Sequence, residues 1–281
     1  MTIKNKRIAV TTTTMVCLLI LGVIVMLPFV FMLVASLTPT REIWGGGLGL
    51  RINPETVTVE NFGALWTHRE GIYWRFFFNS VFVTTVNTSL ILVFTSLVGY
   101  GLGLYDFRGR NIIIVMVLCT MMVPITILLL PLFRFISNLG LMDTYRGLIL
   151  PAMVPAFAIF FFRQFCVSLP KEYMEAARID GCGELKIFLR IYVPLMTPAF
   201  GAMAILQGMG IWNDFIWPMV VLRTTTSLTL APGLMSSMTP YDNAYDILFA
   251  GSVMSIVPIV ILFLFNQRAF IDGLTVGGVK G

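Results

Sequence analysis

Long runs of residues without a charge are the feature that most constrains how this chain of 281 residues can fold. They cover residues 8–40, 76–105, 111–133, 147–162, 191–213 and 247–267. A helix that crosses a bilayer needs about 20 mostly apolar residues. Five of the runs reach that length, and the fourth gains length because the Arg163 side chain can extend to the lipid headgroups. The sequence therefore predicts an all-α integral membrane protein with six transmembrane helices.

The six helices are expected to form one polytopic domain over residues 1–281. We place the spans at about 8–37, 76–105, 111–136, 147–166, 191–222 and 247–268. The hydrophobic content of 57% supports this class, because ordinary soluble domains hold about 45–50% apolar residues. The first run is far longer than the apolar part of a signal peptide, which has about 7–15 residues, so we expect an uncleaved first helix.

Glycines and prolines inside the spans predict how these helices pack and bend. Gly99 and Gly103 lie four residues apart on the second span, and small residues at this spacing let a neighbouring helix approach closely. Prolines inside spans are tolerated where neighbouring groups satisfy the freed carbonyls. They occur at positions 28, 124, 131, 151, 155, 194, 198 and 258.

The distribution of basic residues predicts the orientation, since short loops rich in Lys and Arg stay on the cytoplasmic side. With the N-terminus inside, twelve of the nineteen Lys and Arg residues fall on inner segments and seven on outer ones. Both termini are therefore expected in the cytoplasm. The same bias explains the excess of basic residues, so the sequence predicts contact with membrane lipid and no nucleic-acid partner.

Metal and disulfide chemistry is not expected from this sequence. None of the four cysteines has a CxxC spacing, and His68 is the single histidine. We therefore predict no metal site.

A charged loop at 167–190, on the predicted inner side, interrupts the apolar pattern. Its stretch KEYMEAARID is typical of a helix of about three turns, for which Ser168 is the candidate N-cap. Gly181 and Gly183 follow this stretch and are expected to end the helix.

A helix of this length is marginal in water by itself, so it must dock on a surface. The lipid surface is one alternative, but helices that lie on lipid normally carry Lys and Arg on their polar face. Here three acids, Glu172, Glu175 and Asp180, favour a protein partner. Ala176 and Ala177 are expected to leave a flat surface for its close approach.

The same loop resembles the EAA loop of importer-type ABC permeases. That pattern is EAA, three residues, Gly, nine residues, Ile, any residue, Leu, Pro. The loop matches it at Glu175-Ala176-Ala177, Gly181, Ile191 and Pro194, with Val193 in place of Leu. NSVFVTT, DTYRGLILP, WNDFIWP and the tail NQRAFIDGLTVGGVKG are also similar to the maltose-type, carbohydrate-uptake permeases. The tail is similar to their smaller partner subunit.

This resemblance implies a permease subunit that moves a sugar across the bacterial cytoplasmic (inner) membrane by alternating access. It implies three kinds of partner: a second homologous permease, a dimer of ATP-binding subunits and an extracytoplasmic solute-binding protein. ATP and Mg would be bound by the ATPase partners, and this chain, which has no GxxxxGK[ST] phosphate loop, is not expected to be an enzyme. The charged loop would hold a cytoplasmic coupling helix, with contact residues Glu172, Glu175, Ala176, Ala177, Asp180 and Gly181.

Polar residues inside spans are costly and are therefore candidates for a substrate path or gate. The candidates are Asn79, Gln207, Trp212, Asn213 and Asp214. A structural alternative stays open, in which WNDFIWP is an aromatic belt with a helix-end cap. Thr84, Thr85 and Asn87 either line the same cavity or bond neighbouring helices. In the tail, the resemblance implies contact with the ATPase side through Gln267, Arg268 and Lys280.

Two rival functions are kept. An ABC permease for a non-sugar solute would also carry an EAA loop. An ion-coupled secondary transporter would need paired or membrane-centred acids, for which Asp214 is the one candidate. The outer loop 38–75 is expected either to cap the helices or to form a docking surface for an outer partner.

Overall fold

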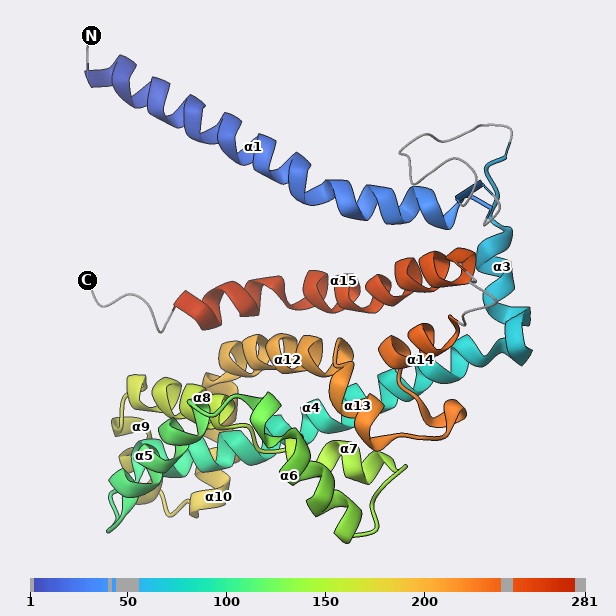
Figure 1. Ribbon diagram of the computed structural model, residues 1–281. Coiled ribbons are helices and arrows are strands. Elements are labelled where there is room, and N and C mark those ends of the chain that lie inside the picture. Colours follow the sequence, from blue (N-terminus) through green and yellow to red (C-terminus); the bar gives the residue numbers. More distant parts are fainter. Residues whose placement is uncertain (1–2, 40–41, 44–55, 239–244, 276–281) are drawn as a thin grey trace. The chain divides into compact units, whose positions relative to one another are not determined.

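The computed structural model describes residues 3–39, 42–43, 56–238 and 245–275 (Figure 1). These residues form helices and connecting turns and contain no strand, so the predicted all-α class is confirmed. The elements are α1 (Ile3–Ser36), α3 (Glu60–Thr67), η1 (His68–Gly71), α4 (Ile72–Leu104), α5 (Arg110–Met121), α6 (Ile125–Asn138), α7 (Tyr145–Ala152), α8 (Ala156–Ser168), α9 (Glu172–Ile179), α10 (Glu184–Ile187), η2 (Phe188–Tyr192), α11 (Val193–Leu195), α12 (Thr197–Trp212), α13 (Ile216–Val221), η3 (Thr225–Ser227), α14 (Leu230–Ser236) and α15 (Tyr245–Thr275).

The chain packs into two compact units. The first comprises Met1–Tyr73 and Leu234–Ile256, and the second comprises Trp74–Gly233 and Val257–Gly281. Helices α4, α14 and α15 therefore each contribute to both units. The expectation of one polytopic domain stays a prediction.

Three helical stretches are long and apolar enough to cross a membrane: Thr11–Ser36, Glu60–Leu104 and Ile247–Phe265. The second of them is kinked at η1, where Arg69 and Glu70 have positive φ. Three bent pairs bring the number to as many as six within the described ranges. The bends are 102° between Arg110–Met121 and Ile125–Asn138, 44° between Tyr145–Ala152 and Ala156–Ser168, and 76° between Glu184–Leu195 and Thr197–Trp212. The spans expected at 111–136, 147–166 and 191–222 are thus divided rather than straight.

Proline accounts for where these helices divide. Pro124 and Pro155 precede α6 and α8, and their own backbone is extended, with ψ of 132° and 134°. Proline has no N–H to donate and also disfavours the helical conformation of the residue before it. In the third pair, Pro194 and Pro198 flank the break at Met196. The proline positions are visible in the sequence, but the bend angles are not.

In the first unit, the carboxyl end of α1 is capped from α3. The Asn61 side-chain amide donates to the carbonyl oxygens of Ser36 (2.8 Å) and Thr38 (3.1 Å), which would otherwise lack helical partners. The two alternatives for loop 38–75, a cover over the helices and a docking surface for an outer partner, both stay predictions. Residues 40–41 and 44–55 of that loop lie outside the described residues.

In the second unit, α8 lies directly against the glycine face of α4. A Cβ on Gly99 would stand 2.6 Å from Phe162 Cβ and 2.8 Å from the Arg163 nitrogen. A Cβ on Gly103 would stand 2.9 Å from Cys166 Cβ. No side chain fits at these distances, so the close helix contact predicted from Gly99 and Gly103 is confirmed.

This contact lies within a continuous apolar core of the second unit. The core joins α4, α8, α9, α10, η2 and α12. Its fully buried side chains include Phe162, Ile187, Tyr192, Met196 and Met203. The loop between α8 and α12 is thus fixed to the spans by apolar packing rather than left in solvent.

Gly99→Ala should destabilise the protein by about 1–3 kcal/mol, the usual cost of overpacking a tight contact. Gly101→Ala, two residues further along α4, is the matched control because a Cβ there meets nothing within 4 Å. The control should leave stability unchanged or slightly raised, since Ala is the better helix former. Thermal unfolding of both variants in detergent measures the difference, and equal melting temperatures would contradict the packing argument.

Candidate functional site

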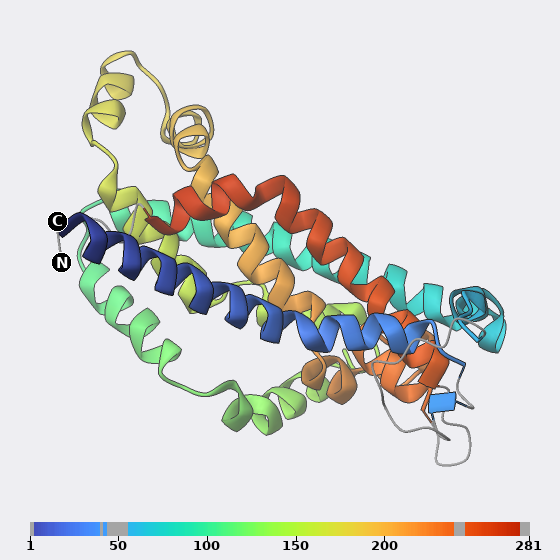
Figure 2. The same ribbon diagram turned by 90° about the horizontal axis from the view of Figure 1, so that it is seen from above.

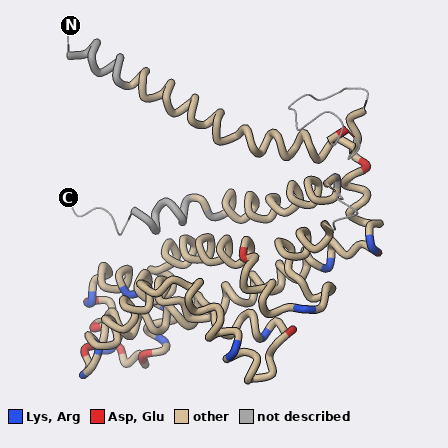
Figure 3. The backbone as a smooth tube through the Cα atoms, in the orientation of Figure 1, with Lys and Arg blue, Asp and Glu red and all other residues tan. Residues whose placement is uncertain are grey.

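The charged loop of the second unit is formed by α9 and α10. Figures 1 and 2 both place these short helices at the same end of the second unit as the carboxyl end of α4, and hydrogen bonding between Tyr105 and Glu184 joins the two regions. Figure 3 shows that Lys, Arg, Asp and Glu gather around α9, α10 and the start of α5. The site is therefore a charged surface carried at one end of the second unit.

Helix α9 has one buried and one exposed face. Met174 and Ala177 are 4% and 5% exposed and belong to the apolar core. Glu172 and Glu175 are exposed, and Ile179 is 86% exposed. The core thus fixes the helix while its acidic face stays available to a partner.

The two alanines do not share a face, which differs from expectation. Ala176 is exposed, whereas Ala177 is buried. Ala177 follows Met174 by three residues, and residues three apart lie on the same side of a helix. Its small side chain therefore serves the packing of α9 within this chain, and Ala176 is the alanine left on the exposed surface.

Gly181 ends α9 in the way that the sequence predicts. Its φ of +74° is left-handed, and its N–H donates to the Arg178 carbonyl at 3.0 Å. The N–H of Cys182 donates to the Ala177 carbonyl at 2.9 Å. These two bonds form a Schellman motif, which favours glycine at this position. Asp180 is exposed beside it.

The prediction of Ser168 as the N-cap of α9 is wrong. Ser168 is the last residue of α8, and its hydroxyl donates to the Phe165 carbonyl at 2.7 Å. Pro170 forces the preceding Leu169 into an extended conformation, with ψ of 143°, which separates the two helices. Helix α9 then begins at Glu172 without a side-chain cap.

A polar contact that the sequence did not reveal holds α9 to α10 and α4. The Arg178 Nε donates to Glu184 Oε1 at 2.8 Å, and the Tyr105 hydroxyl donates to Glu184 Oε2. These hydrogen bonds, that from Arg178 first, lower the pKa of Glu184 below its usual range. The interaction is therefore present at neutral pH and is lost only as the pH falls through that lowered pKa.

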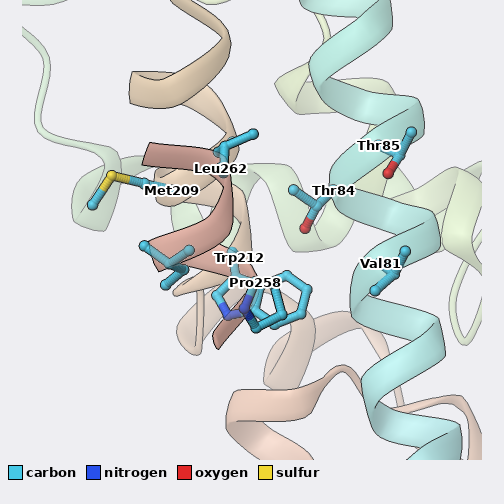
Figure 4. A pocket seen from close by; sticks show the side chains of 9 residues that line it. Val81, Thr84, Thr85, Met209, Trp212, Pro258 and Leu262 are labelled. Carbon is cyan, nitrogen blue, oxygen red and sulfur yellow. The ribbon is translucent and has the colours of Figure 1, made fainter. Parts of the chain in front are cut away.

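A pocket of about 170 Å³ lies elsewhere in the second unit, between α4, α12 and the second half of α15 (Figure 4). It is lined by Val81, Thr84, Thr85, Gly208, Met209, Trp212, Pro258, Ile259 and Leu262. None of these side chains carries a charge. In Figure 4, Thr84 extends from α4 toward Trp212 and Leu262.

Unsatisfied polar atoms on α4 mark the same region. The Thr84 and Thr88 hydroxyls and the Asn87 carbonyl oxygen are buried without a hydrogen-bond partner. The Thr88 oxygen would lie 3.7 Å from a Cβ placed on the pocket residue Gly208. Buried polar groups normally have partners, so this side of α4 is suited to accept a polar ligand. Thr84 and Thr85 line the cavity, which is the first of the two alternatives expected for them. The second was hydrogen bonding to neighbouring helices.

Of the five predicted path residues, Trp212 lines this pocket. The others make contacts within the chain. The Asn213 amide donates to the Met209 carbonyl at 3.0 Å, and Asp214 Oδ1 accepts from the Trp217 N–H at 3.3 Å. These two residues end α12 and begin α13, which matches the helix-end cap that was kept as the structural alternative for WNDFIWP.

Gln207 and Asn79 also have partners. The Gln207 amide nitrogen lies 3.6 Å from Met203 Sδ. The Asn79 amide donates to the carbonyls of Thr226 and Leu228, both at 2.9 Å. Asn79 therefore fixes the segment around η3 to α4, and its part in a substrate path stays a prediction.

Asp143, which the sequence did not single out, joins the connection before α7 to the connection after α13. Its carboxylate accepts from the backbone N–H groups of Arg223 (2.9 Å) and Thr224 (3.0 Å) and from the Thr224 hydroxyl. These hydrogen bonds, the one from the hydroxyl first, lower the pKa of Asp143. Its φ of +59° is tolerated better by Asp than by most residues. No spacing in the sequence indicates this pairing.

Little of the predicted tail contact lies within the described part of the chain. The Gln267 amide donates to the Leu264 carbonyl at 3.2 Å. The side chain of Arg268 and the whole of Lys280 lie outside the described residues. The tail contact stays a prediction.

Comparison with known proteins identifies the family. Residues 95–274 match the family model described as binding-protein-dependent transport system inner membrane component. The chain belongs to this family. It is 53% identical over 258 residues, 92% of each chain, to the arabinooligosaccharides transport system permease protein AraQ of Halalkalibacterium halodurans. It is 48% identical over 275 residues to the AraQ of Bacillus subtilis strain 168, covering 98% of this chain and 96% of the relative.

A more distant relative agrees with this family assignment, and a solved structure shares the fold. The lactose transport system permease protein LacG of Rhizobium radiobacter is 31% identical over 255 residues, 90% of each chain. A chain in the crystal structure of a bacterial ABC transporter involved in the import of the acidic polysaccharide alginate superposes with a TM-score of 0.82. It is 23% identical, and the match covers 96% of this chain and 99% of that one, which shows a shared fold.

Gly181→Ala should destabilise the end of α9 by about 1–2 kcal/mol, because a left-handed conformation is costly for residues with a Cβ. The added Cβ would meet nothing within 4 Å, so backbone strain alone causes the loss. Gly183→Ala is the matched control, since its φ of −71° suits any residue. Limited proteolysis of the loop should be faster for Gly181→Ala than for the control, and equal rates would contradict the assignment.

Proposed function

We propose that this chain is the permease subunit of an ABC importer that carries a neutral sugar into the cell by alternating access. Its family places it in the inner membrane as one component of a binding-protein-dependent system. We propose as partners a second homologous permease, a dimer of ATPase subunits that bind ATP and Mg, and an extracytoplasmic solute-binding protein. In this assembly the chain has no catalytic activity of its own.

Helix α9 is the observation that carries the coupling part of this proposal. It is fixed by Met174 and Ala177 to the apolar core, yet it exposes Glu172, Glu175 and Ile179. A short acidic helix on a rigid base is suited to sit in a basic cleft of an ATPase and to pass that subunit's movement to the spans. This role puts α9 and both chain termini on the cytoplasmic side.

The substrate class rests on the relatives and the pocket. Two relatives at 53% and 48% identity are named as arabinooligosaccharide permeases, so arabino-oligosaccharides are the first candidates to test. The pocket supports a neutral solute, because its lining contains hydroxyls and the Trp212 ring but no charge. Sugars bind proteins through such hydroxyl contacts and through aromatic faces.

The rival functions fit less well. An ion-coupled secondary transporter needs a membrane-centred acid free to change its protonation, but the Asp214 carboxylate accepts a hydrogen bond where α13 begins. A non-sugar ABC permease would share α9 and would differ at the pocket. Uptake measurements with sugars and with amino acids distinguish this rival.

Co-purification from the native membrane tests the proposed assembly. A tagged chain should retain a second permease and an ATPase, and the reconstituted complex should hydrolyse ATP faster when loaded binding protein is added. A chain that purifies alone and transports solute without ATP would contradict the proposal.

Glu175→Lys should release the ATPase from the purified complex, because it puts a positive charge opposite basic groups of the partner. Charged pairs in such interfaces cost about 2–5 kcal/mol to break, a loss of tenfold or more in affinity. Glu60→Lys in α3 makes the same charge change on an exposed acid away from α9 and is the control. Retention of the second permease confirms that both variants are inserted, and ATPase retained at the normal level in Glu175→Lys would contradict the docking role.

Thr84→Val should slow sugar uptake by about fivefold, the effect of losing one hydrogen bond of ~1 kcal/mol to a passing hydroxyl. Folding stability should hold, because the Thr84 oxygen has no partner to lose. Thr95→Val is the control on the same helix, since the Thr95 hydroxyl bonds the Ile91 carbonyl at 2.6 Å and does not line the pocket. Uptake that is equal in the two variants would exclude Thr84 from the path.

A further inference from the structure

We propose that Arg178, Glu184 and Tyr105 form a positioning element through which movement of α9 is transmitted to α4. This inference rests on the proposed function, in which an ATPase moves α9. It assigns a role to two residues, Tyr105 and Glu184, that lie outside the exposed face of α9. The three residues are called the α4–α9 link below.

Each pair of residues in the α4–α9 link is in contact. Arg178 Nε lies 2.8 Å from Glu184 Oε1, and the Tyr105 hydroxyl donates to Glu184 Oε2. The Arg178 Cζ lies 5.6 Å from the centre of the Tyr105 ring, within cation–π range. The link is therefore a closed triangle, which resists displacement in more directions than a single ion pair.

The triangle joins three elements at their ends. Arg178 lies in the last turn of α9, Glu184 is the first residue of α10, and Tyr105 directly follows Leu104, the last residue of α4. The carboxyl end of α4 is itself held by Arg110, whose guanidinium donates to the carbonyls of Leu102 (2.9 Å) and Gly103 (3.2 Å). A displacement of α9 therefore meets a fixed helix end.

Apolar packing holds α9 on one face, and the link holds it on another. The helix has eight residues, is buried through Met174 and Ala177, and is followed by Gly181 and Gly183. The link holds its last turn on a different side, so that movement of α9 displaces α4 instead of tilting α9 alone.

Helix α4 extends from the link to the pocket. Its residues Val81, Thr84 and Thr85 line the pocket, and about 20 residues separate Thr85 from Tyr105. At 1.5 Å per residue this is about 30 Å of continuous helix. A shift at the carboxyl end of α4 is thereby carried to the pocket wall.

The aromatic rings packed around Tyr105 supply a matched control. The Tyr192 ring lies 4.9 Å from the Tyr100 ring, and the Tyr100 ring lies 5.6 Å from the Tyr105 ring. The Tyr192 hydroxyl is buried and has no hydrogen-bond partner. Tyr192→Phe and Tyr105→Phe thus each remove one hydroxyl from one aromatic cluster, but only Tyr105→Phe removes the hydrogen bond that joins residue 105 to Glu184.

The test uses the complete importer in liposomes, with sugar imported per ATP hydrolysed as the readout. Tyr105→Phe should lower this ratio by about fivefold, the low end of typical coupling between sites. The ATPase should remain in the purified complex, and Tyr192→Phe should match the wild type. Glu184→Ala should act like Tyr105→Phe, and the double variant should be no worse than either single one, because all three changes break the same link.

Three results would overturn the inference: a normal ratio in Tyr105→Phe, additive losses in the double variant, or an equal loss in Tyr192→Phe. Loss of the ATPase from the Tyr105→Phe complex would also overturn it, because the link would then serve docking. The proposed function fails separately, if the wild-type complex contains no ATPase or if ATP hydrolysis does not respond to the loaded binding protein.

Discussion

The close approach of α8 to α4 at Gly99 and Gly103 is the contact on which the rest of the second unit depends. In a membrane, water gives helices no hydrophobic reason to associate, so packing at small residues must supply the attraction. Because α8 leads through Leu169 and Pro170 into α9, this contact also sets where the charged loop lies at the carboxyl end of α4. The polar link at Tyr105 is possible because the backbone of α8 is already held against α4.

Proline bends give this apolar chain a shape that straight helices would not. Each bend frees carbonyl groups, which must find donors within the protein or in a water-filled cavity. The bend near Met196 directs α12 away from the loop, and the break after Trp212 begins α13. Movement between such segments needs less rearrangement of hydrogen bonds than movement within a straight helix, which suits a protein that alternates between two states.

Local features of the fold and the site were predictable from the sequence, and non-local ones were not. Helix α9 and its end at Gly181 follow from composition and from glycine chemistry, which act over a few residues. The burial of Ala177 depends on which face of α9 meets the core, and the pairing of Tyr105 with Glu184 joins residues 79 apart. The pocket combines three distant helices in the same way. Periodicity and motif spacing carry no information about such pairings.

The polar residues inside the spans show how a sequence signal differs from a structural one. The sequence gives the cost of placing a polar residue in the membrane, and the structure gives its hydrogen-bond partners. Asn79, Asn213 and Asp214 were predicted for a substrate path because polar groups in a membrane are costly, yet each is engaged with backbone groups at a helix break or a neighbouring turn. Thr84 has the same cost and no such contact. A polar residue whose hydrogen bonds are complete has its explanation within the fold. Thr84, whose hydroxyl has no partner and lines the pocket, is therefore the polar residue of this set that contacts within the chain do not explain.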